Sequence, residues 1–292
     1  MEAERKQGKP VIAMNTAEQL DRKYQENLER IRNFRLMDDD FMTKCFEGDT
    51  ACAELVLRIV LDKPDLMVTD VRTQVFVENL TDRSLRLDIL ATDSTGRKYN
   101  IEIQRADKGA GRKRARFHAS MIDSGALEKK KDFEALPEAY VVFITERDVI
   151  GQGRPVYHVE RCIMESGECF GDGSHILYVN GAYRDETPIG KLMHDFDCKD
   201  PAQMHYGVLA DRVRFFKESK EGTATMCKMI EDILNKEHEE ALQQGIQQGI
   251  QQGLIEAAKN MLRNSGLALE KIAECVELPL EEVQRLHAEM SR

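Results

Sequence analysis

Residues 85–104 constrain the fold more than any other stretch, because they carry the pattern of a β-hairpin. Two runs of alternating apolar and polar residues flank the turn Ser94-Thr95-Gly96. A three-residue loop of this kind needs a left-handed residue in its last position, which glycine accepts at little cost. The turn fixes the register, with Asp93 facing Arg97 and each further pair one residue outward on both strands.

This register predicts which side chains share a face. One face is apolar and is expected on a core, with Leu87, Ile89 and Ala91 opposite Ile103, Ile101 and Tyr99. The other face carries Asp88 opposite Glu102, with Gln104 further along the same side. Opposed like charges destabilise a sheet unless a proton or a cation lies between them, so the register indicates a divalent-metal site. The alternative is a solvent-facing hairpin whose outer face is merely acidic.

Composition limits the class of protein. Of 292 residues, 41% are hydrophobic and 32% charged, and no run is long and apolar enough to span a membrane. No signal-peptide pattern is present, so we expect a cytoplasmic protein without a membrane partner. The net charge of −10 excludes a chain that is basic throughout. A local basic stripe can still bind nucleic acid.

The cysteines indicate reduced, mostly buried thiols. There are seven, scattered and never in a Cys-x-x-Cys pair. The alternative is a zinc site, although the spacing of its four candidate ligands matches no common motif; they are His158, Cys162, Cys169 and His175.

Hydrophobic periodicity predicts a mixed order of elements. Helices are expected from Thr16, over 50–61 and over 111–127. Strands are expected over 67–77, in the hairpin, and over 139–145, 157–164 and 176–179, with a turn at Asn180-Gly181. From Ala202 onward the pattern is helical, with a break near Gly222.

The segment that follows the hairpin is the most basic of the chain. Residues 105–116 contain one acid, Asp107, and six basic residues: Arg105, Lys108, Arg112, Lys113, Arg114 and Arg116. With His118 they form the expected nucleic-acid-binding surface. A metal on Asp88 and Glu102 beside these cations fits cleavage of a phosphodiester. Oxygen ligands suit Mg²⁺ or Mn²⁺, and Glu54 is a further expected ligand.

Residues 243–253 contain a Gln-Gln-Gly repeat with a period of four. It places Leu242, Ile246, Ile250 and Leu254 in a narrow helical stripe. The repeat is either a helical spacer, which we favour, or a segment that pairs with a second copy. The tail, 254–292, resembles a helix-turn-helix unit. Its last helix is not basic, which favours protein contact or self-association, as a homodimer or higher oligomer, over DNA reading.

Several of these segments together resemble a known family. Asp88, then thirteen residues, then Glu102-Ile103-Gln104, in the order helix-strand-strand-strand-helix-strand, is similar to the PD-(D/E)XK nuclease superfamily. More narrowly, the chain resembles the Rpn family of recombination-promoting nucleases, also described as PD-(D/E)XK family transposases. The segments that carry this resemblance are 34–46, 101–104, 116–123, 136–144 and the repeat. The resemblance implies an α/β (α+β) fold: a restriction-endonuclease-like mixed sheet flanked by helices, with an all-helical C-terminal extension.

The resemblance also implies an activity, that of a Mg²⁺-dependent (or Mn²⁺-dependent) DNA endonuclease linked to recombination or mobile DNA. Asp88 and Glu102 are then catalytic metal ligands, Ile103 a further ligand, and Gln104 stands in place of the lysine. Leu87 also replaces the motif's proline. Gln104 carries no positive charge, so either catalysis is slower or another group supplies the charge; the candidates are Arg105, Arg116 and His118. The alternative function is a catalytically degenerate DNA-binding or assembly protein. A DDE-type transposase is disfavoured, because it needs three spaced carboxylates on a different fold.

The expected organisation has five parts. Residues 1–33 form a charged, flexible segment, 34–200 the nuclease-like domain and 201–240 a helical extension. Residues 241–253 form the spacer helix and 254–292 the small helical tail.

Overall fold

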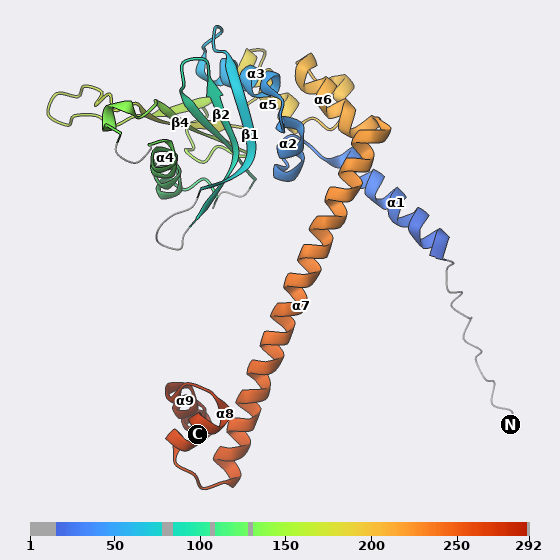
Figure 1. The fold of residues 1–292 in the computed structure, drawn as a ribbon, viewed down its shortest axis with the longest axis vertical. Coiled ribbons are helices and arrows are strands. Elements are labelled where there is room, and N and C mark those ends of the chain that lie inside the picture. The colour runs from blue at the N-terminus through green and yellow to red at the C-terminus, as the bar shows by residue number, and fades with distance from the viewer. Residues whose placement is uncertain (1–15, 78–83, 106–108, 128–130, 291–292) are drawn as a thin grey trace. The chain divides into compact units, whose positions relative to one another are not determined.

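The computed structural model describes residues 16–77, 84–105, 109–127 and 131–290 (Figure 1). The chain divides into two units, 1–227 and 228–292. Within the described ranges, no helix combines the length and the apolar character needed to cross a membrane. Of the predicted flexible start, 1–33, residues 1–15 lie outside the described residues, and the rest, Thr16–Asn33, forms the helix α1.

A six-stranded mixed sheet is the centre of the first unit. Its strands are β1 Val68–Val77, β2 Leu85–Asp93, β3 Lys98–Gln104, β4 Ala139–Thr145, β5 Val156–Val159 and β6 Ser174–Asn180. Their spatial order is β1-β2-β3-β4-β6-β5. The β3–β4 and β4–β6 pairs are parallel and the other pairs antiparallel.

Helices cover both faces of this sheet (Figure 1). One face is covered by α4, and α2 and α3 lie against β1 on the other side, near α5 and α6. The helices of the unit are α1 Thr16–Asn33, α2 Asp39–Phe46, α3 Thr50–Leu61, α4 Arg112–Ala126, α5 Pro188–Asp197 and α6 Gly207–Glu218, with 3₁₀ turns at Phe133–Ala135 and Pro201–Gln203. The predicted mixed sheet flanked by helices, with a helical C-terminal region, is confirmed.

The hairpin has the predicted turn and register. Gly96 has φ +87° and its N–H donates to the Asp93 carbonyl at 3.1 Å. The Asp93 N–H donates to the Arg97 carbonyl at 3.1 Å. The pairs that follow are Thr92–Lys98, Ala91–Tyr99, Leu90–Asn100 and Ile89–Ile101. The aspartate side chain accepts from the N–H groups of Thr95 and Arg97, which stabilises the bend.

Beyond Ile89 and Ile101 the two strands are no longer paired, and the predicted alternation is wrong at Leu87. The ladder between β1 and β2 is also interrupted, because Gln74 and Asp88 are not paired with each other. Gln74 has a φ of +53°. Leu87 therefore packs in the cluster under α4, with Ala115 and Phe143, while Ile89 is outside that cluster. The solvent-facing alternative is wrong as well, because Glu102 is fully buried and Asp88 is 7% exposed.

Several other helices and strands can be compared with the elements predicted from the sequence. Helix α3 starts as predicted, with the Asp49 side chain accepting from the Cys52 N–H. Strand β5 stops at Val159 instead of reaching Met164, and α5 was not predicted. The predicted break near Gly222 lies instead at Ser219, between α6 and α7. Gly222 is inside α7, where an added Cβ would collide with the Phe215 carbonyl of α6.

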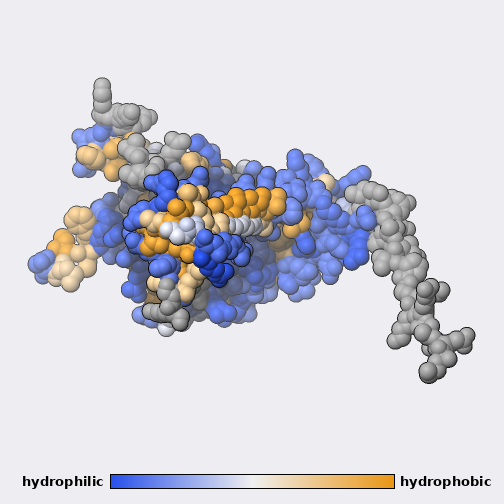
Figure 2. All heavy atoms as spheres, turned by 90° about the horizontal axis from the view of Figure 1, so that it is seen from below, coloured by the Kyte–Doolittle hydropathy of each residue, from blue (hydrophilic) through white to orange (hydrophobic). Residues whose placement is uncertain are grey.

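The second unit contains most of α7 (Lys220–Asn264) together with α8 (Leu269–Val276) and α9 (Leu280–Met290). Helix α7 runs unbroken through the Gln-Gln-Gly repeat, so the predicted separate helices are one. Its last turns pack on α8 and α9 around a cluster that includes Ala258, Ile272 and Val283. Leu242, Ile246 and Ile250 are more than half exposed. Figure 2 shows apolar side chains, in orange, gathered among hydrophilic ones, in blue, on the face seen from below.

Candidate active site

The structure brings Asp88 and Glu102 together where β2 and β3 separate. The Asp88 N–H donates to Oε1 of Glu102 at 3.1 Å, and the Ile103 N–H donates to Oδ2 of Asp88 at 3.3 Å. Each carboxyl group thus accepts a main-chain donor of the opposite strand. The side chains replace the ladder hydrogen bonds that end at Ile89 and Ile101, which fixes both acids in place.

Burial makes this pair difficult to ionise. It raises the pKa of Asp88 to about 8, with further contributions from the charges of Glu102 and Asp39. Burial also raises the pKa of Glu102, against the opposing effects of the Asp88 N–H, Asn100 and Arg114. Two buried carboxyl groups in direct contact favour a state with a shared proton. A bound cation satisfies the same site in place of that proton.

The donors fit a divalent cation with a preference for oxygen. Oε2 of Glu102 is buried and has no hydrogen-bond partner in the described part of the chain. Such an oxygen is costly to bury unless something binds it. Two adjacent carboxylates are the ligand type that Mg²⁺ and Mn²⁺ take in proteins, and Asp88 and Glu102 are the residues that would hold the ion.

Asp39 is a third acid near the pair, and the sequence reasoning did not select it. It is the first residue of α2, and its charge raises the pKa of Asp88. Burial, followed by the charge of Asp40, raises the pKa of Asp39 itself. The signal in the sequence is the acidic run 38–40, which is equally typical of the first turn of any helix.

Glu54, the predicted further ligand, is engaged elsewhere. Its Oε2 accepts from the Val68 N–H at 2.9 Å and its Oε1 lies 2.7 Å from Arg58. The carboxylate joins the middle of α3 to the start of β1, which is a structural contact.

Two side chains of α4, Arg114 and His118, are hydrogen-bonded to each other and lie close to Glu102. Nε of Arg114 donates to Nε2 of His118 at 3.1 Å, and a terminal nitrogen of Arg114 lies 3.6 Å from Oε2 of Glu102. Nδ1 of His118 lies 3.0 Å from the Asn100 amide. That amide atom is Nδ2 of Asn100, itself a donor, and Oε1 of Glu102 lies 3.5 Å from the same ring nitrogen. Burial, then the charge of Arg114, lowers the pKa of His118 to about 4, so the ring is neutral.

The predicted nucleic-acid-binding residues fall into separate groups. Arg112, Lys113 and Arg116 are exposed on α4, whereas His118 is fully buried and faces no solvent. Arg105 lies 2.9 Å from Asp38, and Lys108 is outside the described residues. Gln104 is the last residue of β3 and, two positions from Glu102, is expected on the same face.

Two other sets of polar residues have structural explanations. His194, Asp195 and His205 hold potential ligand atoms within 4.8 Å of one another. Both Asp195 oxygens already accept main-chain N–H groups, of His205 and Tyr206 at 2.8 Å, which holds the start of α6. The alternative zinc set of His158, Cys162, Cys169 and His175 is not gathered among the described residues.

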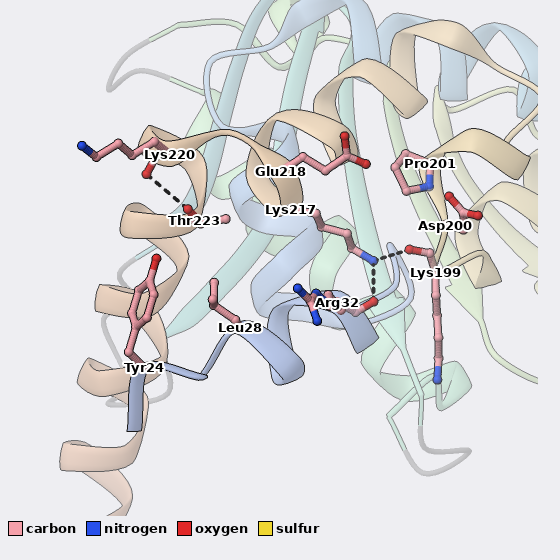
Figure 3. Close-up of a pocket in the computed structure, with 10 residues that line it drawn as sticks. All are labelled: Tyr24, Leu28, Arg32, Lys199, Asp200, Pro201, Lys217, Glu218, Lys220 and Thr223. Carbon is pink, nitrogen blue, oxygen red and sulfur yellow. Dashed lines mark hydrogen bonds between the residues drawn. The ribbon is translucent and has the colours of Figure 1, made fainter. Parts of the chain in front are cut away.

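A hollow of about 670 Å³ lies between α1, α6 and the start of α7 (Figure 3). Figure 3 shows Lys217 pointing at the carbonyl groups of Arg32 and Lys199, to which its Nζ donates. Burial lowers the pKa of Lys217 to about 8. None of the residues that line this hollow is among the site residues predicted from the sequence.

Comparison with known proteins gives a family match that spans this region of the chain. Residues 57–184 match the family model described as PD-(D/E)XK nuclease family transposase, and this range contains Asp88, Glu102 and α4. No curated protein and no solved structure matches the chain.

Proposed function

We propose that this chain, whose residues 57–184 form a PD-(D/E)XK nuclease family transposase domain, is a DNA endonuclease that depends on Mg²⁺ or Mn²⁺. The observation that supports the proposal best is the buried Asp88–Glu102 pair, in which one carboxylate oxygen accepts no hydrogen bond from the described residues. The narrower Rpn membership and a link to recombination or mobile DNA are part of the same proposal.

The residues have distinct roles in this proposal. Asp88 and Glu102 would hold the cation, with Ile103 beside them, and Asp39, whose charge acts on Asp88, would contribute a third acid through water. Such a cation, when bound, polarises the phosphoryl oxygen and lowers the pKa of its water. Gln104 accepts a hydrogen bond from the attacking water and orients it, but supplies no charge.

Arg114 is the residue that best supplies the missing positive charge. Of the three candidates named from the sequence, Arg105 is paired with Asp38, Arg116 is exposed, and His118 is neutral. Arg114 lies 3.6 Å from Oε2 of Glu102 and is oriented by His118. A guanidinium group offers planar donors that match carboxylate and phosphate oxygens. His118 therefore acts as a positioning residue.

DNA binding is assigned to the exposed cations of α4. Arg112, Lys113 and Arg116 lie on the helix that carries Arg114, so a phosphate backbone along α4 approaches the acidic pair. Contacts of this kind are independent of sequence and weaken with salt. Cleavage of both strands requires two sites, which the exposed stripe of α7 could bring together in a homodimer.

Cleavage of supercoiled plasmid tests the proposal. We expect nicking with Mg²⁺ or Mn²⁺, none with Ca²⁺ or EDTA, and a loss of at least about 10²-fold in Asp88→Asn and Glu102→Gln. Glu54→Gln is the matched control, since that carboxylate binds Val68 and Arg58. Equal nicking by wild type and both site variants contradicts the proposal.

The second candidate is a DNA-binding or assembly protein that has lost the reaction. The observation in its favour is Gln104 at the position of the lysine. Calorimetric titration with Mn²⁺ distinguishes the two functions. A nuclease binds the ion in a way that depends on Asp88, whereas the absence of such binding together with retained DNA affinity supports the second candidate.

A further inference from the structure

We infer that Cys162 and Cys169 form a modification site, a dithiol that small-molecule disulfides convert into an internal disulfide. The two residues lie in the segment 160–173, between β5 and β6, which projects at the left of Figure 1. This segment is called the finger below. Both cysteines are free and exposed.

The finger holds the two cysteines directly opposite each other. They form an isolated antiparallel bridge. The Ile163 N–H donates to the Glu168 carbonyl at 2.8 Å, and the Phe170 N–H donates to the Arg161 carbonyl at 2.9 Å. Hydrogen bonds that flank a pair in this way define a non-hydrogen-bonded position of an antiparallel ladder.

That position has the dimensions of a disulfide. Opposed residues there have Cα atoms about 4.5 Å apart, and their side chains leave the same side of the ribbon. A disulfide joins Cα atoms about 4.4–6.8 Å apart, so the bond forms without a large backbone movement. The Gly167 N–H donates to the Ile163 carbonyl at 2.7 Å and closes the tip, and the ion pair Arg161–Asp172 joins the two sides at the base.

The other cysteines are less suited to this chemistry. Burial raises the pKa of Cys52 to about 12, that of Cys45 well above its usual range, and that of Cys198 as well. Cys275 is exposed on α8, in the other unit. Within the described residues, only Cys162 and Cys169 are both exposed and paired across a ladder.

The reaction is two successive thiol–disulfide exchanges. The thiolate of one cysteine attacks a sulfur of the small disulfide, whose S–S bond breaks, and one small thiol leaves with a proton. The second cysteine attacks the mixed disulfide at the protein sulfur and releases the second small thiol. The protein loses two electrons and two protons, and the small disulfide gains them as two thiols.

The test uses the full chain in buffers of reduced and oxidised glutathione, followed by alkylation, trypsin and mass spectrometry. Both cysteines lie in one tryptic peptide, 162–184, because no lysine or arginine separates them. We expect this peptide to become two hydrogens lighter, while Cys275 stays alkylated or carries glutathione. Cleavage after Glu165 and Glu168 should leave the fragments linked until a reductant is added.

Three variants complete the design. Cys162→Ser and Cys169→Ser should each carry glutathione on the remaining cysteine, and Cys275→Ser should behave as wild type does. The inference is overturned if wild type carries only glutathione adducts on both cysteines. It is also overturned if the peptide stays reduced under conditions that modify Cys275, or if the cysteines link to a second chain. Far-UV circular dichroism checks that the variants are folded.

Discussion

The main-chain N–H of Asp88 donates to the side chain of Glu102 at 3.1 Å. Asp88 thus fixes the carboxyl group of Glu102 with its main chain and pairs with that group through its own side chain. The Ile103 N–H holds Asp88 in return. This reciprocal arrangement forms only because β2 and β3 separate at that point. The acids are thus fixed before any ligand binds, which reduces the cost of ordering them.

Divalent cations should bind more tightly and stabilise the protein more as the pH rises toward 8. In metal-free protein the folded pKa of Asp88, about 8, exceeds the unfolded value of about 3.9. The folded state therefore keeps a proton that the unfolded state has lost, and the free energy of unfolding falls between these pH values. Mn²⁺ replaces that proton. Thermal melting with Mn²⁺ or EDTA should show a larger stabilisation at pH 8 than at pH 6.

Asp88→Asn is the control for that measurement. The variant should show no stabilisation by Mn²⁺ and a flatter pH dependence of the melting temperature. An equal response to Mn²⁺ in wild type and Asp88→Asn would place the ion elsewhere.

Asp39→Asn and Glu54→Gln should affect different properties. Removing the charge of Asp39 takes an acid from the site, and this loss outweighs the weaker proton competition that follows from a lower pKa of Asp88, so Mn²⁺ affinity falls while stability changes little. Removing the charge of Glu54 weakens the contacts with Val68 and Arg58, so the free energy of unfolding falls by about 1–3 kcal/mol while Mn²⁺ affinity is retained. Calorimetry and urea denaturation measure the two properties. The reverse pattern would make Glu54 the ligand.

Arg114→Ala should lower the rate of cleavage, and Arg116→Ala should lower only DNA affinity. Arg114 is in contact with His118 and near Glu102, whereas Arg116 is exposed on α4. Single-turnover nicking at saturating DNA measures the first effect. Salt-dependent binding measures the second, in which loss of one phosphate contact reduces the slope by about 1. Equal cleavage rates in both variants would remove Arg114 from the site.

Gly249→Ala should stabilise α7 locally by about 1 kcal/mol, because nothing lies within 4 Å of the added Cβ and alanine is the better helix former. Slower hydrogen exchange of the amides near residue 249 measures this. Gly222→Ala is the contrasting variant, because its Cβ collides with the Phe215 carbonyl and the protein should lose stability. Faster exchange in Gly249→Ala would show that the glycine is needed for a contact between chains.

The hairpin was predictable because its turn and its alternation specify the same register, and β4 was predictable because a buried strand is a continuous apolar run. The interruption of the β1–β2 ladder at Gln74 and Asp88 was not predictable, because it depends on contacts of β2 with two neighbouring strands at once. Periodicity also cannot show that Asp39, Arg114 and His118 approach the pair, because those contacts are tertiary. Helix α5 was missed between Pro188 and Asp197, although the sequence carries its signals: Pro188 in the first turn after the N-cap Thr187, and an apolar stripe of Ile189, Leu192, Met193 and Phe196 at helical spacing.

The repeat within α7 has a consequence for the length of this helix. Four residues advance an α-helix by about 6 Å and turn it by about 40°. Gain or loss of one Gln-Gln-Gly-Ile unit would therefore move α8 and α9 along the helix axis in fixed steps, without altering a residue of the cluster that packs them. The number of copies of this tetrapeptide therefore sets the length of α7.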